Sequence, residues 1–292
     1  MSFASTLGAA LLAAGTQLLV LLGPLALAVV GLDLSSAALQ RAAVRLVGWR
    51  AFLLVFGWLG TAVHELSHAL FCVLFGHRVT ELRLFDPRAS DGSLGYVRHA
   101  YNPRNPVHQI GNLFIGIAPV LVGGAALTLA AFALLGGLDA RPLPDAAGRV
   151  AAGGHGALEL ARRVLDGLLS LAAPAIGGAR VGWLRVGAFC YLAIAIGSLM
   201  RMSAEDAKGA LPGLAAIASL LVVADLAALL LTGEAPTALA WRAAFGLATA
   251  YAVLIAAMAI NLAAAAALFL TSLAAGRWTG RGNATNLGGN RK

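Results

Sequence analysis

Residues 50–75 read RAFLLVFGWLGTAVHELSHALFCVLF, a stretch that is apolar along nearly its whole length. As a helix, a segment of this length crosses the roughly 30 Å hydrocarbon core of a bilayer. Five further stretches are long and hydrophobic enough to do the same. The sequence therefore predicts an all-α polytopic membrane protein with six transmembrane helices. The predicted spans cover residues 5–32, 50–75, 107–136, 181–202, 210–232 and 244–272.

The overall composition excludes a soluble domain. Of the 292 residues, 60% are hydrophobic and only 12% are charged. The formal net charge of +8 would suggest nucleic acid in a soluble protein, but the basic residues lie between and beside the spans, where lipid headgroups explain them. We therefore expect a lipid bilayer, and no nucleic acid, around this chain. The excess of arginine over lysine, with abundant alanine and glycine, is typical of a GC-rich bacterial genome.

The segments outside the spans differ in character. Residues 35–49 predict an amphipathic helix at the membrane interface, with a solvated connector as the alternative. Residues 77–106 form two partly alternating runs around a turn, which predicts a small β-hairpin against the membrane. A short helix is expected around 158–171. The tail 277–292 is rich in Gly and Asn and is expected to be disordered. The remaining residues, 1–276, are predicted to form one transmembrane domain.

The chain has two cysteines, Cys72 and Cys190, and each lies within a predicted span. Two isolated thiols in lipid-embedded helices are interpreted as small packing residues and not as a disulfide. The redox compartment of the protein does not follow from them.

The second span contains the motif His64-Glu65-Leu66-Ser67-His68. Residues four apart project from one face of a helix, so both imidazoles can reach one metal ion, while Glu65 lies where it can meet a metal-bound water. Zinc lowers the pKa of bound water toward about 7, and a carboxylate can pass its proton to the leaving amine. The motif therefore predicts metal-assisted hydrolysis with Glu65 as general base. The alternative is a buried polar cluster that only holds helices together.

Two histidines leave a zinc site incomplete, so a third ligand must come from elsewhere in the chain. Cys72 continues the same helix face, but it lies about 12 Å along the axis from His64 at 1.5 Å per residue. Asp206 is the preferred third ligand because it directly follows the fourth predicted span. The second and fourth spans run in the same direction, so their C-terminal ends bring His64, His68 and Asp206 to one membrane side. The alternatives are Asp225, Glu205, His77, His99 and His108.

Three features together resemble the site-2 protease class of intramembrane zinc metalloproteases, especially its compact bacterial members without a PDZ domain. They are HELSHALFCVLFGH at 64–77, the β-like segment that follows, and GNLFIGIAP at 111–119. The resemblance covers about residues 50–215. It implies intramembrane proteolysis of a membrane-protein substrate by a multi-pass protein of the bacterial inner membrane. Because the active site of this class opens inward, it also implies that both termini are cytoplasmic.

The resemblance assigns roles to four residues. It implies that His64, His68 and Asp206 hold one Zn²⁺ per chain and that Glu65 is the general base of a zinc metalloendopeptidase. The Leu-Asp-Gly sequence that is usual around the third ligand of the class is replaced here by Glu-Asp-Ala at 205–207.

The Gly-Pro-x-x-Asn element of the class is also reduced, to Ala118-Pro119 without the following Asn. Asn112, seven residues before Pro119, is a candidate for a hydrogen bond to the substrate or oxyanion. The alternative is an amide that packs helices together.

A substrate helix hides its carbonyl groups in its own hydrogen bonds and must be unwound before hydrolysis. An exposed strand edge in 79–85 or 94–101 could hold the unwound segment as an added strand. The alternative is a hairpin that only plugs the entrance of the active site.

Two other functions compete with proteolysis. One is a catalytically silent, zincin-like membrane scaffold that binds membrane partners, and the intact Glu65 argues against it. The other is a metal transporter, which would need acids or histidines spread along several spans. Only Asp225 lies deep in another span, so transport ranks last.

Overall fold

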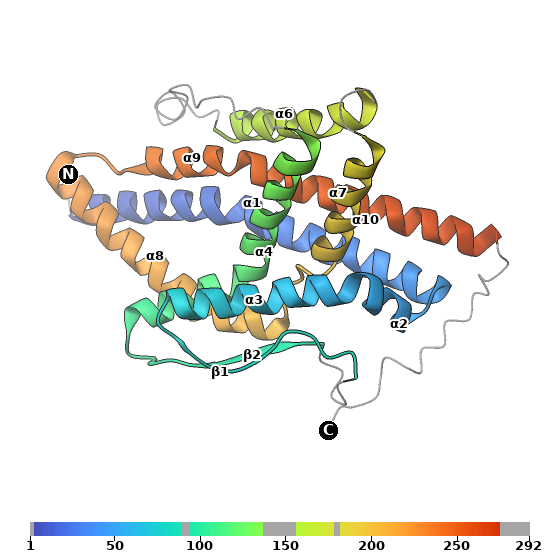
Figure 1. Ribbon diagram of the computed structural model, residues 1–292. Helices are drawn as coiled ribbons and strands as arrows, with labels where there is room; N and C mark the ends of the chain where they lie inside the picture. Colours follow the sequence, from blue (N-terminus) through green and yellow to red (C-terminus); the bar gives the residue numbers. More distant parts are fainter. Residues whose placement is uncertain (1–2, 89–93, 137–155, 178–181, 275–292) are drawn as a thin grey trace.

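The computed structural model describes residues 3–88, 94–136, 156–177 and 182–274. The chain forms a body of packed helices with one two-stranded hairpin along its lower edge, below α3, and α6 at the opposite edge (Figure 1). The elements are α1 (Phe3–Leu46), α2 (Trp49–Phe52), the π-helical turn η1 (Leu53–Gly57), α3 (Trp58–Leu74), β1 (Arg78–Arg83), β2 (Tyr96–Ala100), α4 (Pro106–Leu135), α6 (Gly156–Gly177), α7 (Trp183–Gly197), α8 (Ala204–Thr232), α9 (Thr237–Gly246) and α10 (Ala248–Ala274).

The structure confirms the all-α polytopic class. Each of the six predicted spans falls mainly on helix. Four helices, α1, α4, α8 and α10, are long and apolar enough to cross a membrane. The other two are shorter, because α3 has 17 residues and α7 has 15. α3 is nevertheless preceded directly by α2 and η1, so the chain stays helical from Trp49 to Leu74.

Of the segment 35–49, expected as a separate interfacial helix or connector, residues 35–46 instead supply the last turns of α1. Two of its polar groups face the protein, since Ser36 Oγ donates to the carbonyl of Gly197 and Gln40 Nε2 donates to the carbonyl of Ser198. Part of the amphipathic pattern therefore reflects packing against the end of α7, while Arg41 and Arg45 are exposed. At 1.5 Å per residue, the 44 residues of α1 extend about 66 Å.

Small residues allow the helices around the motif to approach closely. A Cβ atom on Gly60 would lie 2.1 Å from the carbonyl oxygen of Ala195, so α3 and α7 touch backbone to backbone. A Cβ atom on Gly213 would lie 2.5 Å from the carbonyl oxygen of Gln109, so α8 and α4 do the same. Glycine at such crossings is typical of helices that pack inside a membrane.

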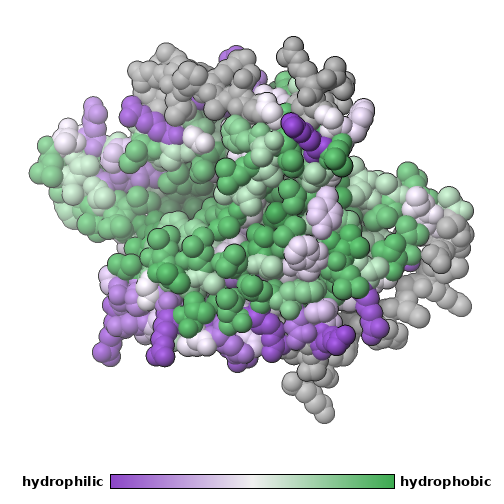
Figure 2. Space-filling view, viewed as in Figure 1, coloured by the Kyte–Doolittle hydropathy of each residue, from purple (hydrophilic) through white to green (hydrophobic). Residues whose placement is uncertain are grey.

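The predicted hairpin is present. β1 and β2 are antiparallel, with Arg78 opposite Ala100 and Val79 opposite His99. Hydrophilic side chains gather along the lower edge of the molecule, where the hairpin lies, while hydrophobic ones cover the middle of this face (Figure 2). The helix expected at 158–171 lies within α6, and the tail expected to be disordered falls outside the described residues.

Candidate metal centre

α3 directs both histidines of the motif toward one point. Their Nε2 atoms lie 3.1 Å apart. Nδ1 of His64 lies 2.8 Å from the carbonyl oxygen of Leu199, and Nδ1 of His68 lies 2.8 Å from that of Ile115. Because a carbonyl oxygen only accepts hydrogen bonds, each Nδ1 carries the proton. The two Nε2 lone pairs are therefore free and face each other.

The third donor is Asp206, at the start of α8. Its Oδ1 lies 3.6 Å from Nε2 of His68. Its Oδ2 accepts the backbone N–H of Ser203, while Ser203 Oγ accepts the backbone N–H of Asp206. This reciprocal capping box fixes the carboxylate and leaves Oδ1 for the cluster. The ligand atoms of His64, His68 and Asp206 all lie within 4.8 Å of one another, and these three residues are called the motif cluster below.

The contact between α4 and α8 explains why Asp206 reaches the histidines. A Cβ atom on Gly116 would lie 2.7 Å from the carbonyl oxygen of Asp206, so only glycine allows this approach. The neighbouring residue on α4, Ile115, supplies the carbonyl that orients His68. One turn of α4 therefore orients His68 through the carbonyl of Ile115 and leaves room for Asp206 at Gly116.

The donor set of the motif cluster fits zinc. Two imidazole nitrogens and one carboxylate oxygen are ligands that zinc accepts, and catalytic sites keep a fourth position open for water or substrate. The backbone carbonyls on the Nδ1 protons are the outer partners that orient metal-binding histidines. These residues are therefore suited to hold a hydrolytic metal ion.

Glu65 lies beside the motif cluster and is only 8% exposed. The segment leading into β2 passes directly over it, because a Cβ atom on Gly95 would lie 2.7 Å from Cγ of Glu65. The hairpin thus covers the carboxylate that the motif predicts as general base.

The competing acids lie elsewhere. Asp225 is 1% exposed and accepts a hydrogen bond of 2.9 Å from Gln17 on α1. It lies about 28 Å further along α8 than Asp206, at 1.5 Å per residue. Glu205 is exposed. Neither acid joins a group of metal donors in the described part of the chain.

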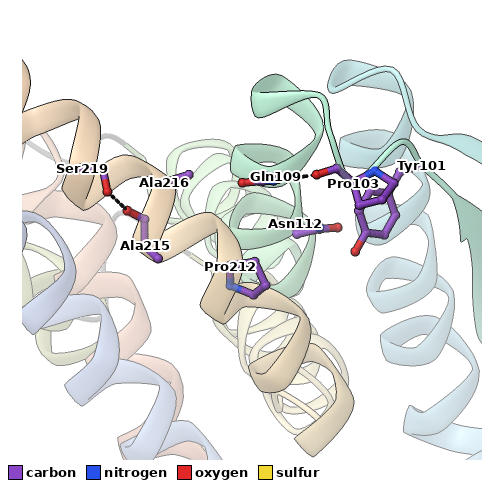
Figure 3. A pocket seen from close by; sticks show the side chains of 8 residues that line it. All are labelled: Tyr101, Pro103, Gln109, Asn112, Pro212, Ala215, Ala216 and Ser219. Carbon is purple, nitrogen blue, oxygen red and sulfur yellow. Dashed lines mark hydrogen bonds between the residues drawn. The ribbon is translucent and has the colours of Figure 1, made fainter.

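Asn112 lines a pocket of about 460 Å³ between α4, α8 and the end of the hairpin. It is buried and reaches from α4 toward Tyr101 and Pro103 (Figure 3). The pocket lining includes none of the three metal donors. Asn112 therefore borders an opening near the hairpin, and its hydrogen bond to a substrate stays a prediction.

Sequence reasoning missed the groups that orient the donors. The carbonyls of Leu199 and Ile115 carry no signal in a sequence, because any residue offers one. Ser203 did carry a signal, since Ser-x-x-Asp is the pattern of a capping box. The alternatives His77 and His99 lie beside Cys72 at the C-terminal end of α3, outside the motif cluster.

Residues 36–92 match the protein-family model described as Peptidase M50B-like. No curated protein and no solved structure matches the chain significantly. The matched segment contains the whole zinc-protease motif and β1 and ends before β2. The match makes this segment similar to M50B-like peptidases and supports the resemblance of the motif to the site-2 protease family.

Proposed function

We propose that this protein is an intramembrane zinc metalloendopeptidase that hydrolyses peptide bonds in or near the transmembrane segments of membrane proteins. One observation carries the proposal: two histidines of one helix and an aspartate of another converge within 4.8 Å, with a buried glutamate beside them. The family match supports a metallopeptidase of this type. The long apolar helices support an integral membrane protein.

A bound zinc ion would supply Lewis-acid chemistry, lowering the pKa of water and polarising the scissile carbonyl. Glu65 then accepts the proton of the attacking water and delivers it to the leaving amine. Its burial under the hairpin keeps bulk water away from the carboxylate. His64 and His68 are held in one orientation by their carbonyl partners, so the site needs little rearrangement.

The hairpin supports binding of an extended substrate. In a two-stranded sheet, each strand has one edge without a strand partner among the described residues. An unwound substrate segment can add to such an edge through main-chain hydrogen bonds. Because the segment leading into β2 also passes over Glu65, a strand added there would lie near the general base.

The test compares Glu65→Gln with wild type on a co-expressed single-span membrane substrate, at matched expression and measured zinc content. Glutamine preserves size but cannot accept the proton, so turnover should fall at or beyond the top of the 10²–10⁴-fold range typical of general acid–base catalysis. Zinc content should remain near that of wild type. Glu234→Gln, an exposed position after α8, is the matched control and should cleave normally.

Wild-type turnover in a zinc-loaded Glu65→Gln protein would contradict the protease mechanism. Absence of cleavage by wild type across membrane substrates, with zinc bound, would favour the silent scaffold.

A further inference from the structure

A second group of metal-donor side chains lies at the C-terminal end of α3. Cys72, His77 and His99 place one donor atom each within 4.8 Å of the other two. Cys72 is fully buried, and His77 is 4% exposed. These three residues are called the hairpin cluster below. The mechanism of peptide hydrolysis does not use them.

The end of α3 brings Cys72 and His77 together. Gly76 has a φ of +73°, and its N–H donates to the carbonyl of Val73. The N–H of His77 donates to the carbonyl of Cys72 at 2.7 Å. This pair of bonds is the Schellman motif, in which the side chains at these two positions contact each other. In most helices the contacting pair is hydrophobic, whereas here it is a thiol and an imidazole.

The register of the hairpin places His99 beside Cys72 and His77. Val79 of β1 lies opposite His99 of β2, and side chains two apart on a strand share one face of the sheet. His77, two residues before Val79, therefore shares that face. Its Nδ1 lies 3.1 Å from Nδ1 of His99, and its ring stacks on Tyr101 with centroids 4.9 Å apart.

The tautomer of His77 suits metal binding. Its Nε2 lies 3.0 Å from the carbonyl oxygen of His108, so Nε2 carries the proton and Nδ1 presents a lone pair to the cluster. A backbone carbonyl on the outer nitrogen is the usual second partner of a metal-binding histidine.

We propose that Cys72, His77 and His99 bind a second metal ion of the zinc type, which fastens the hairpin to the end of α3. Thiolate and imidazole are the donors that structural zinc sites use. Around a tetrahedral zinc ion, two such donor atoms lie roughly 3.3–3.8 Å apart, and the observed separations of 3.1 Å to within 4.8 Å need only small side-chain shifts to match. The fourth position is left to water or another group.

This site does not depend on metal binding by the motif cluster. The only donor helix that the two clusters share is α3, and no residue belongs to both. The alternative is a direct hydrogen bond in which one of the facing Nδ1 atoms donates to the other, with Cys72 as a packing thiol. The two arrangements differ in metal content and in cysteine ligation, and both can be measured.

The experiment loads the full-length protein, purified in mild detergent, with Co²⁺. A thiolate ligand gives cobalt a charge-transfer band in the near ultraviolet, which the motif cluster cannot produce because it has no sulfur donor. Wild type should bind two ions per chain and show the band. Cys72→Ser should bind one ion and lose the band. Cys190→Ser removes the other thiol of the chain and should keep both ions and the band.

The outcomes separate this site from the proposed protease centre. His64→Ala should bind one ion fewer than wild type but keep the band. If wild type itself binds one ion and shows the band, the hairpin site is supported and the metal site of the motif cluster is not. Wild type without the band, or a band that survives Cys72→Ser, would overturn the proposal. If Cys72→Ser does not fold, His99→Gln replaces it, with helix content checked by circular dichroism. An unchanged ion count in folded His99→Gln would also overturn the site.

Discussion

The motif cluster and the hairpin cluster share helix α3 but are assembled differently. The motif cluster takes two donors from successive turns of α3 and its third from the first turn of α8. The hairpin cluster takes one donor from α3, one from the residue that closes the helix end and one from β2. In both clusters, histidine protons are held by backbone carbonyls, as His68 and His77 illustrate.

The difference shows which sites a sequence reveals. The motif cluster depends mainly on a spacing of four residues within one helix, and that spacing is visible in the letters HELSH. The hairpin cluster depends on a left-handed glycine and on strand register. Neither feature can be deduced from Cys72, His77 and His99 alone, so the sequence predicts a packing role for Cys72 and offers the two histidines only as alternative ligands of the motif cluster.

Among changes that test how the two clusters are assembled, Asp206→Ala has the largest expected effect, because it should remove a ligand of the motif cluster only. Mutation of an outer partner typically costs 10–100-fold in metal affinity or activity, so loss of a ligand should cost more than about 100-fold in turnover. Zinc content and cleavage of a single-span substrate are the measurements. The cobalt band of the hairpin cluster should persist.

Asp225→Ala is the matched control, because it removes a buried aspartate from the same helix. It should keep two ions per chain. Full zinc in Asp206→Ala together with loss in Asp225→Ala would show that the third ligand is assigned wrongly.

Gly95→Ala tests the link between the clusters and should have the next largest effect. The added methyl would lie 2.7 Å from Cγ of Glu65 and 2.8 Å from the carbonyl oxygen of Arg83, so the segment leading into β2 must move. A misplacement of about 1 Å can cost about 100-fold in rate. Because Gly95 directly precedes β2, which carries His99, the cobalt band should change together with the turnover. Cleavage rate and the band are measured together.

Gly187→Ala on α7 controls for the added methyl, since a Cβ atom there meets no other atom within 4 Å. Normal turnover in Gly95→Ala would show that the hairpin does not constrain Glu65.

Much of the fold was accessible from the sequence because bilayer thickness and backbone hydrogen bonding limit the structures that apolar stretches can form. The helical segments followed from that limit, and the hairpin at 77–106 followed from two partly alternating runs around a turn. The merger of 35–49 into α1 did not, because Gln40 is directed inward by a carbonyl of the chain after α7. At the site, spacing predicted His64 and His68. The position of Asp206 beside them depends on the close approach of α4 and α8, which no local pattern encodes.

Ser203→Ala should weaken the motif cluster without affecting the hairpin cluster. It removes the Oγ that accepts the backbone N–H of Asp206, so the helix start that carries the carboxylate keeps only one of the two bonds of the capping box. Zinc affinity at the motif cluster should fall by roughly tenfold, the lower end of the range for outer partners. Competition with a chelator measures it. Ser170→Ala on α6, a serine that belongs to neither cluster, should leave the affinity unchanged, and an equal loss in both variants would contradict the positioning role of Ser203.

The smallest effect is expected far from both clusters, where Gln17 of α1 donates to the buried carboxylate of Asp225 on α8. Asp225 Oδ2 has no hydrogen-bond partner in the described part of the chain. The bond from Gln17 to Oδ1 therefore offsets much of the cost of burying this carboxylate. Gln17→Ala should lower the free energy of unfolding by about 1–3 kcal/mol, the cost of leaving such a group unsatisfied. Thermal unfolding in mild detergent measures the loss, with the neighbouring exposed Thr16→Ala as control. Both metal ions and the cleavage rate of the folded protein should stay at wild-type values. Loss of zinc in Gln17→Ala would instead show that Asp225 affects metal binding at the motif cluster. It would contradict the assignment of Asp206 as the ligand and Asp225 as a purely structural residue of α8.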